Sequence, residues 1–287
     1  MDKDFFSLNI MELLKAGSFY LESKGIPDSR TEADLLLAFV RGIPRDKLYL
    51  ELNKEVSPQE KEKYQEFLRR RGEREPLAYL LKTREFMGLE FYVDRNVLIP
   101  RPETELLAEK VLDFSKNNLV QKPVRILDLC TGSGALAVAV AFYWEGAEVV
   151  GTDISQEALS VAQKNAMQNH VQVDFRLGDL FRPVLGERFH IIVSNPPYVS
   201  EEEYGYCSPE VRNEPVLALL GGKDGLDYYR KIALEAEEFL MSEGTLILEI
   251  GCCQGQAVKE IFAGRGYQSL IFPDYAGHDR IVMAKKE

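Results

Sequence analysis

From about residue 103 to its end, the chain alternates strand-like and helix-like segments, an order that few folds accommodate. Short apolar runs separated by segments of helical periodicity are typical of an α/β fold with a mostly parallel sheet and helices on both faces. The predicted strands are Val124–Leu129, Glu148–Thr152, Gln172–Leu177, His190–Ser194, Thr245–Ile250, Gln268–Phe272 and Ile281–Ala284. Such sheets bind ligands beyond the carboxyl ends of their strands, so we expect functional residues directly after these runs.

Residues 1–84 follow a different pattern, which predicts a small helical domain. Two capping boxes, Ser29 with Glu32 and Ser57 with Glu60, mark expected helix starts, and Gly42 marks a helix end. The basic run Arg69–Arg71 fits either a solvated helix end or a contact with an acidic partner. No catalytic constellation lies in this part, so its expected role is recognition or support.

Residues 85–102 are expected to link the two parts. The run EFMGLEFYVDRNVLI has Gly88 between two short aromatic and aliphatic stretches, a pattern that predicts a β-hairpin. The expected organisation is therefore a helical domain at 1–84, a hairpin linker at 85–102 and an α/β domain at 103–287.

The composition, 45% hydrophobic and 28% charged residues, is that of a globular protein able to bury a core. No apolar run is long enough for a membrane span, and the N-terminal MDKDFFSLNI lacks the layout of a secretion signal. We therefore expect a cytoplasmic protein without membrane association. Its four cysteines, Cys130, Cys207, Cys252 and Cys253, have no zinc-binding spacing and are expected to be reduced packing residues.

The negative charge is unevenly distributed along the chain. The 16 basic and 16 acidic side chains of residues 1–85 balance, so the net charge of -11 belongs to residues 86–287. This later part should repel a phosphate backbone, and direct nucleic-acid binding is not expected.

A glycine-containing turn follows the first predicted strand and leads into a helix near Ala135. Glycine lets a ligand approach the backbone, and the helix start offers unpaired N–H groups to an anion. The residues of this candidate nucleotide site are Cys130, Thr131, Gly132, Ser133 and Gly134. The pattern alone is weak evidence, because turns often need glycine.

Two further acidic residues follow the next two strands. Asp153 can accept hydrogen bonds from both hydroxyls of a ribose, although it can also cap the helix that Ser155 begins. Asp179 can meet an adenine amino group while Leu180 packs on the ring; a solvated loop acid is the alternative. Nicotinamide cofactors and S-adenosylmethionine both need a ribose-binding acid, so these residues leave both open.

The tetrapeptide Asn195-Pro196-Pro197-Tyr198 follows the fourth strand. Its prolines fix the backbone and lack N–H donors, which leaves carbonyl oxygens free to accept. The Asn195 side-chain oxygen and the Pro196 carbonyl can each accept one hydrogen of a planar NH₂ group, with Tyr198 packed on its face. An amide nitrogen held in this way can direct its lone pair at a sulfonium methyl group, without a metal or a nucleophilic side chain. An ordinary proline turn is the alternative.

With this tetrapeptide, the chain resembles the release factor glutamine methyltransferases over nearly its whole length. The matching motifs are Pro76–Leu81, Glu85–Leu89, Val97–Glu105, the glycine turn, the tetrapeptide and Gly221–Leu226. The resemblance implies a class I S-adenosylmethionine-dependent methyltransferase domain with a Rossmann-like seven-stranded sheet, preceded by a helical domain that helps dock the substrate. It also implies methylation of the side-chain amide nitrogen of the GGQ glutamine in bacterial peptide release factors one and two.

Carried over to this chain, the family's cofactor site includes the turn Cys130–Gly134, Asp153, Leu180 and Asn195, and the substrate amide is held by Asn195–Tyr198. Cys130 departs from the family, in which this position is usually glycine, and its side chain is expected to crowd the methionine end of the cofactor. Two rivals share the tetrapeptide: a glutamine methyltransferase of a large-subunit ribosomal protein, and an amino methyltransferase of nucleic acid.

Overall fold

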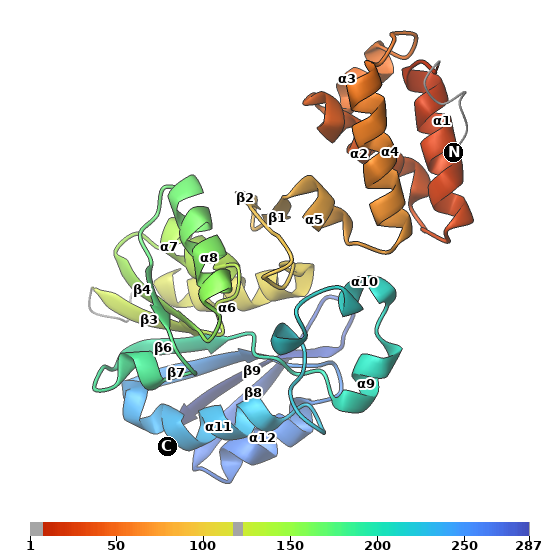
Figure 1. Cartoon of the computed structure of the whole chain (residues 1–287). Helices are drawn as coiled ribbons and strands as arrows, with labels where there is room; N and C mark the ends of the chain where they lie inside the picture. Colours follow the sequence, from red (N-terminus) through yellow and green to blue (C-terminus); the bar gives the residue numbers. More distant parts are fainter. Residues whose placement is uncertain (1–7, 117–122, 287) are drawn as a thin grey trace. The chain divides into compact units, whose positions relative to one another are not determined.

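The computed structural model describes residues 8–116 and 123–286 (Figure 1). The first seven residues, part of the segment in which no secretion signal is expected, lie outside this range. The described chain forms two compact units. The first contains the residues up to Lys82 together with Pro209–Asn213, and the second contains Thr83–Ser208 and the chain from Glu214 onward.

The first unit is helical. Its helices are α1 (Ile10–Ser23), α2 (Ser29–Arg41), α3 (Arg45–Leu50), α4 (Pro58–Gly72), α5 (Leu77–Leu81) and the short α10 (Pro209–Arg212). Leu13, Leu36 and Leu68 are fully buried members of one hydrophobic core that joins α1, α2 and α4. This core accounts for the helical periodicity of the sequence.

One predicted capping box is confirmed and the other is wrong. Ser57 and Glu60 exchange the two hydrogen bonds of a capping box at the start of α4. At α2 the N-cap is Asp28, and its side chain makes no capping bond. Glu32 instead pairs with the buried guanidinium of Arg71, at 2.5 Å, because that ion pair compensates a charge that would otherwise be buried alone.

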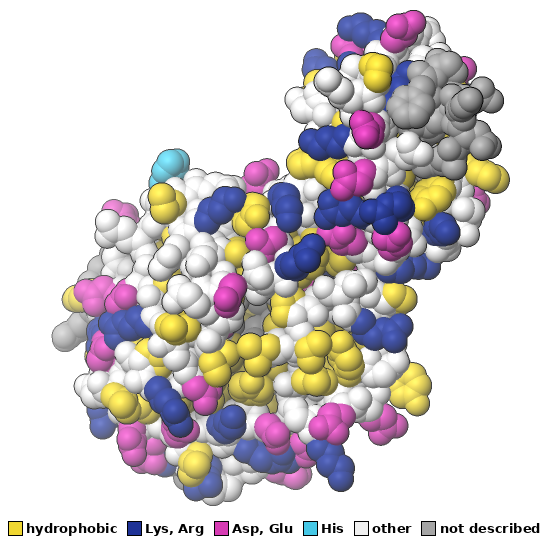
Figure 2. Space-filling view, viewed as in Figure 1, with side chains coloured by type: hydrophobic (Ala, Val, Ile, Leu, Met, Phe, Trp, Pro, Cys, Tyr) yellow, Lys and Arg dark blue, Asp and Glu magenta, His cyan; other side chains and the backbone are white. Residues whose placement is uncertain are grey.

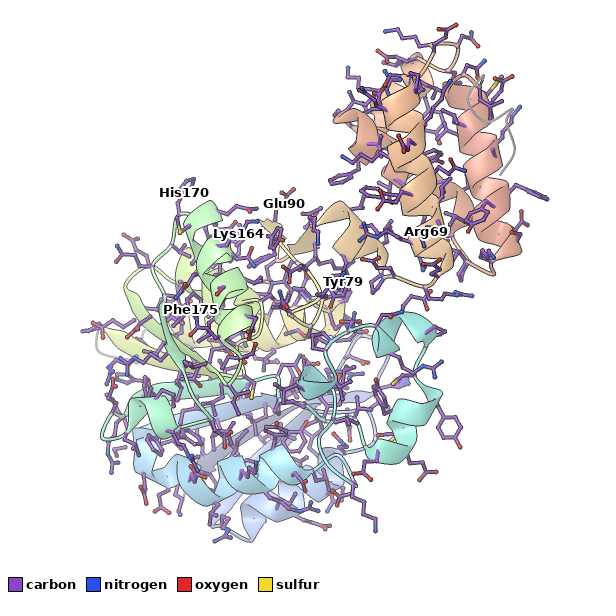
Figure 3. The ribbon with its side chains drawn as sticks, viewed as in Figure 1. Arg69, Tyr79, Glu90, Lys164, His170 and Phe175 are labelled. Atoms are coloured by element: carbon purple, nitrogen blue, oxygen red, sulfur yellow. The ribbon has the colours of Figure 1, made fainter. Side chains whose placement is uncertain are left out.

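The arginine run is therefore not a uniformly solvated helix end. Arg71, buried in the first unit, also reaches Glu210 of the same unit, at 3.0 Å. Arg69, labelled in Figure 3, is exposed and pairs with Glu73 on its own helix. Each of these two arginines has an acidic partner within this unit.

The second unit contains a seven-stranded mixed sheet of order β5-β4-β3-β6-β7-β9-β8. The five neighbouring strands β5, β4, β3, β6 and β7 are parallel to one another, and β9 runs antiparallel to its two neighbours, β7 and β8. The strands are β3 (Val124–Leu129), β4 (Ala147–Asp153), β5 (Asp174–Leu177), β6 (Phe189–Ser194), β7 (Leu240–Glu249), β8 (Tyr267–Pro273) and β9 (Asp279–Lys286). The expected α/β fold with seven strands is confirmed.

Helices cover both faces of this sheet (Figure 1). One face carries α6 (Pro102–Lys116), α7 (Ala135–Tyr143) and α8 (Gln156–Gln168); the other carries α11 (Asp227–Glu235) and α12 (Gly255–Ala263). Side chains alternate between the two cores along each strand: Ile191 and Val193 of β6 belong to one core and Ile192 to the other. Burial on both faces explains why the strands read as continuous apolar runs.

The predicted hairpin is present at the start of the second unit. Strand β1 (Arg84–Phe86) pairs antiparallel with β2 (Leu89–Phe91), and both residues between them, Met87 and Gly88, have positive φ. Positive φ at both central positions defines the turn that suits the twist of a two-residue hairpin. Phe86 and Phe91 pack edge to face, at 6.0 Å between ring centres, in the core of the sheet domain.

Short helices complete the second unit: α9 (Glu201–Tyr206) and the 3₁₀ helices η2 (Arg182–Val184), η3 (Val216–Ala218) and η4 (Ala236–Phe239). Among the described residues, no helix is both long and apolar enough to cross a membrane. All four cysteines are free thiols, but Cys252 and Cys253 are exposed, so the expectation that all four are packing residues is wrong for this pair.

Candidate functional site

A pocket that is partly open to solvent lies at the carboxyl ends of the parallel strands in the second unit. It brings together seven of the predicted site residues: Cys130, Gly132, Asp153, Asp179, Leu180, Asn195 and Pro197. A smaller adjoining pocket shares Cys130, Gly132 and Asn195 with it and adds Thr131 and Ser133. Hydrophobic side chains gather on the face of this unit seen in Figure 2, around a hollow.

The glycine turn after β3 uses its two glycines differently, although Gly132 and Gly134 both have positive φ. A Cβ on Gly132 would meet nothing nearer than the Cys130 carbonyl at 3.9 Å, so this position opens onto the pocket. A Cβ on Gly134 would lie 2.9 Å from the Ala162 side chain and 3.2 Å from the Phe175 ring, which is labelled in Figure 3. Gly132 therefore leaves open space at the pocket, and Gly134 allows α7 and α8 to pack closely.

Cys130 also adopts a left-handed backbone, with φ of 58°. A glycine would adopt this conformation without strain, whereas an L-residue pays about 1–2 kcal/mol. Its thiol packs against the core, and burial raises its pKa above the ordinary value of 9.0. The thiol therefore stays protonated, and Cys130 lines both pockets as a small neutral side chain.

Asp153, at the end of β4, joins the turn to the next helix. One carboxylate oxygen accepts from the Gly132 N–H and the other from the Ser155 N–H, both at 2.9 Å. Ser155 itself caps α8 through a 3.1 Å bond from the Ala158 N–H. Asp153 is therefore not the N-cap, and its carboxylate keeps a lone pair for a further donor. Burial raises its pKa, while these N–H groups oppose the rise.

A second buried carboxyl, Asp128, was missed by the sequence analysis although it lies in the predicted strand. It accepts a 2.6 Å hydrogen bond from the Thr131 hydroxyl, and burial raises its pKa to about 7. The charge of Asp153 contributes to this rise. With Asp179 also lining the main pocket, the site gathers acidic groups, which suit a ribose-bearing cation better than an anionic pyrophosphate.

The tetrapeptide begins where β6 ends. The Asn195 amide nitrogen donates to the Thr104 hydroxyl at 3.1 Å, and no described residue donates to its oxygen. Pro196 and Pro197 are buried, and no donor to the Pro196 carbonyl exists among residues 8–116 and 123–286. Among the described residues, these two oxygens therefore have no hydrogen-bond donor, and their role toward a substrate amide stays a prediction.

The Tyr198 side chain points elsewhere. Its ring packs against the core on the α11 side of the sheet, and its hydroxyl lies 3.5 Å from a carboxyl oxygen of Glu249. Its carbonyl accepts from the Gln254 amide at 2.9 Å. Tyr198 and Pro196 are not among the residues that line either pocket, so stacking of Tyr198 on a substrate amide stays a prediction.

The structure adds pocket residues from segments that the sequence analysis did not connect with the site. These are Asn96–Leu98 after the hairpin, Ile154 after Asp153, the segment from Pro215 to Ala218, and Tyr228 on α11. Val97–Leu98 lie within a motif that had been noted only for its resemblance. Tyr228 has no signal in the sequence, because its position depends on how α11 packs on the sheet.

Asn165 of α8 is another structural residue that the sequence analysis missed. Fully buried, it exchanges hydrogen bonds with the backbone of Tyr92, at 2.7 and 3.0 Å, and donates to the Ser133 carbonyl at 2.8 Å. The ammonium of Lys164, labelled in Figure 3, lies 3.1 Å from the centre of the Tyr92 ring. The glycine turn is therefore held to the segment after the hairpin.

The described residues contain no group of three or more His, Cys, Asp or Glu side chains placed to hold a metal ion. The acidic groups at the pocket, the open space beside Gly132 and the remaining lone pair on Asp153 all fit S-adenosylmethionine, which carries a ribose and a positive sulfonium.

Comparison with known proteins agrees with this site. Residues 12–81 match the family described as PrmC N-terminal domain, and residues 104–207 match the family described as methyltransferase small domain. Among solved structures, a methyltransferase from Pyrococcus furiosus is 21% identical, with a TM-score of 0.52 over 70% of this chain and 91% of its own. The hMettl16 catalytic domain is 17% identical, with a TM-score of 0.54 over 73% of this chain and 78% of its own. These two likenesses concern the fold alone.

Curated relatives match the chain more closely. The release factor glutamine methyltransferase of Geobacter sulfurreducens is 40% identical over 265 residues, which cover 92% of each chain. The enzyme of the same name from Bacillus cereus is 34% identical over 286 residues, 98% of this chain and 100% of its own. At such identity over nearly whole chains, the resemblance seen in the motifs is confirmed, and this protein belongs to the release factor glutamine methyltransferases, a family that depends on S-adenosylmethionine.

Proposed function

We propose that this chain transfers a methyl group from S-adenosylmethionine to the side-chain amide nitrogen of the GGQ glutamine in bacterial class-one peptide release factors. The observation that carries the proposal is the position of Asn195, whose free oxygen belongs to a residue lining both pockets. The family of the chain supports the choice of a release factor as substrate.

The residues proposed to hold the cofactor surround the main pocket. Asp153 would accept from the ribose hydroxyls, Asp179 from the adenine amino group, and Leu180 would pack on the ring. The turn Cys130–Gly134 would contact the methionine end, with Gly132 leaving the space. When bound, S-adenosylmethionine supplies an electrophilic methyl group on a positively charged sulfur.

The proposed catalytic groups are Asn195, Pro196 and Tyr198. A glutamine amide nitrogen is a weak nucleophile, because its lone pair is delocalised into the carbonyl group. Asn195 Oδ1 and the Pro196 carbonyl would each accept one N–H, which orients the nitrogen and favours its pyramidal form. Orientation of this kind can supply about 7–11 kcal/mol of a barrier. Pro197 and Tyr198 would complete the substrate site.

We further propose that three parts of the chain have different roles. Residues 1–84 would recognise the release factor, residues 85–102 would link, and residues 103–287 would bind the cofactor and catalyse transfer. Release factors one and two would both be substrates. Nucleic acid would not be bound directly, because the net charge of -11 belongs to residues 86–287.

The test is a labelled-methyl assay on the full chain. Its substrates are release factor one, release factor two, each factor with its GGQ glutamine replaced, a large-subunit ribosomal protein and a DNA duplex. We expect label only on the two intact release factors. Label on the ribosomal protein or the duplex alone would contradict the proposed substrate, and label on the altered factors would contradict the proposed acceptor atom.

A further inference from the structure

The segment Gly221–Leu226, one of the motifs shared with the family, lies directly against the tetrapeptide in the second unit. A Cβ on Gly221 would lie 2.6 Å from the Pro197 carbonyl oxygen, and a Cβ on Gly225 would overlap the Tyr198 carbonyl oxygen. Only glycine, which has no Cβ, lets two backbones approach this closely. We call this segment the 221–226 loop.

The side chain of Gln254 holds the same two backbones together. Its amide nitrogen donates to the Tyr198 carbonyl at 2.9 Å and to the Gly225 carbonyl at 3.3 Å. Its Oε1 atom accepts from the Gly251 N–H at 2.9 Å. A single half-buried carboxamide therefore bonds the tetrapeptide, the 221–226 loop and the turn after β7.

The orientation of this carboxamide follows from its partners. A backbone carbonyl only accepts and a backbone N–H only donates, so the NH₂ group must face Tyr198 and Gly225, and the oxygen must face Gly251. Rotation of the amide by half a turn would set donor against donor and acceptor against acceptor. Only one orientation is therefore stable.

The capping of α12 does not account for the Gln254 side chain. Gln254 is the N-cap residue of this helix, where a polar side chain commonly accepts from the first turn, yet its side chain makes no capping bond. Its amide bonds instead to residues that lie 56 and 29 positions earlier in the sequence. The side chain therefore serves the tetrapeptide and the 221–226 loop.

The tetrapeptide needs such a partner because its prolines cannot be held through N–H groups. Pro196 and Pro197 have a fixed φ but donate no hydrogen bond, so the direction of their carbonyls depends on how the chain is anchored on either side. Before the prolines, Ser194 is fixed in the ladder of the sheet. After them, the Tyr198 carbonyl is anchored on Gln254.

We propose that Gln254 is a positioning residue for methyl transfer, which sets the direction of the Pro196 carbonyl by tying Tyr198 to the 221–226 loop. The inference rests on the proposed function, since that function makes the Pro196 carbonyl an acceptor of the glutamine N–H. Gln254 is not among the residues that line either pocket. It therefore acts on transfer through the tetrapeptide, and not on binding of the cofactor.

The first experiment reads the anchoring without any substrate. The Val199 N–H donates to the Leu219 carbonyl and the Gly221 N–H to the Val199 carbonyl, both at 2.9 Å, so these two amides report how firmly the chain after the tetrapeptide is held. Gln254→Met keeps the length of the side chain and removes its polar atoms. In hydrogen-exchange NMR of the full chain, we expect it to speed exchange of both amides by about 3- to 10-fold, the effect of one net hydrogen bond.

The matched control is Gln256→Met. Gln256 lies on the same helix, and its amide donates to Glu260 of that helix at 2.7 Å, so both reporter amides should exchange as in wild type. The Val193 amide in the sheet should be unchanged in both variants. Unchanged reporter amides in Gln254→Met, or equal acceleration by Gln256→Met, would overturn the inference, whatever the activity.

The second experiment measures methyl transfer to a release factor. Gln254→Met should lower kcat by about 10- to 100-fold, because a displacement of about 1 Å at a group that orients the substrate can cost a factor of this order. The affinity for S-adenosylmethionine, measured by calorimetry, should stay close to that of wild type. An unchanged kcat, or a loss of affinity as large as the loss of kcat, would overturn the inference.

Gln254→Glu distinguishes positioning from packing. It keeps the shape and the oxygen that accepts from Gly251, but its ionised form turns an acceptor toward the Tyr198 and Gly225 carbonyls, whereas its protonated form can donate to them. These carbonyls, and Asp279 against the start of α12, should raise the pKa of the new carboxyl. Its kcat relative to wild type should therefore rise as the pH falls from 8 to about 6, while that of Gln254→Met stays constant.

The outcomes separate the two proposals. A loss of kcat in Gln254→Glu that does not change with pH would overturn the role of Gln254, and this test stands even if Gln254→Met does not fold. A wild-type chain inactive on release factors would instead overturn the proposed function, and the exchange experiment would still decide whether Gln254 anchors the tetrapeptide.

Discussion

Asn195 lies where the main pocket, the proposed cofactor site, meets the tetrapeptide, so its substitution should separate cofactor binding from transfer. We predict that Asn195→Ala lowers kcat/KM by about 10²–10³-fold, the range observed when a group that stabilises a transition state is removed. S-adenosylmethionine should still bind measurably, because Asp153 and the glycine turn remain. Calorimetric titration and the methyl-transfer assay measure the two effects. Turnover close to that of the wild type would remove Asn195 from the proposed role.

Asp128 predicts a pH dependence of stability. Its pKa is raised from 3.8 to about 7 by burial, so the folded state keeps a proton that the unfolded chain releases between these values. The free energy of unfolding contributed by this group therefore falls as the pH rises from about 4 to about 7. Asp128→Asn cannot ionise and should not show this fall.

The measurement is urea unfolding of wild type and Asp128→Asn at pH 5 and pH 8. We expect the stability of the variant relative to wild type to be higher at pH 8 than at pH 5. A difference that is the same at both values would mean that Asp128 titrates normally in the folded protein.

At the scale of elements, the turn between β3 and α7 offers a matched pair of substitutions. Gly132→Ala and Gly134→Ala both place an L-residue at positive φ, which costs about 1 kcal/mol or more. Only the Cβ at 134 would also collide, at 2.9 Å from the Ala162 side chain. We predict the larger loss of stability for Gly134→Ala, and the larger loss of cofactor affinity for Gly132→Ala, because its Cβ enters the pocket.

Thermal unfolding and cofactor titration of the two variants check this prediction. If Gly134→Ala were the more stable of the two, the close packing of α7 on α8 would not be limited by this position. If Gly132→Ala bound S-adenosylmethionine as well as wild type, the open space beside Gly132 would not hold the cofactor.

The strands were predictable because their apolar runs reflect burial on both faces. Strand β3 has the predicted bounds, whereas β7 begins at Leu240 and not at Thr245. The intervening Ser242-Glu243-Gly244 is polar and contains glycine, so its sequence is typical of a turn. In the structure this segment lies within β7, with Glu243 at positive φ. The alternation of strand and helix similarly predicted the mostly parallel sheet, although it did not predict the order of the strands.

Much of the site could be predicted because its residues follow strands directly. The remaining pocket residues could not, because they depend on contacts between distant segments. Asn165 bonds to Tyr92, 73 residues away, and Asn195 to Thr104, 91 residues away. The failed capping box at Ser29 has the same origin, since Glu32 meets Arg71, 39 residues later. Local patterns carry no information on such partners.

At the scale of the whole molecule, the two compact units should respond separately to perturbation. A ligand stabilises the part that binds it, so S-adenosylmethionine should raise the unfolding midpoint of the sheet unit only. Arg71 belongs to the helical unit, where it is buried against Glu32. We predict that Arg71→Met destabilises the helical unit by about 2 kcal/mol, because the partly buried Glu32 carboxylate loses its hydrogen-bonded partner.

Denaturant unfolding followed by probes in each unit, with and without S-adenosylmethionine, tests this independence. Arg69→Met is the control, because the Arg69–Glu73 pair is exposed and should contribute little. Equal effects of the two substitutions, or a cofactor-induced shift of both midpoints, would show that the units unfold as one.

The pairing of β3 with β6 has a consequence for how such a protein can vary. Leu129 lies opposite Ser194, whose hydroxyl also donates to the Leu129 carbonyl at 2.7 Å, although 65 residues separate them. The first residues beyond both strands, Cys130 and Asn195, are therefore aligned by the backbone ladder. Insertions or deletions in the loops between these strands would change the protein surface. They would leave unchanged the distance between Cys130 and Asn195, and with it the distance between the proposed methyl donor and acceptor.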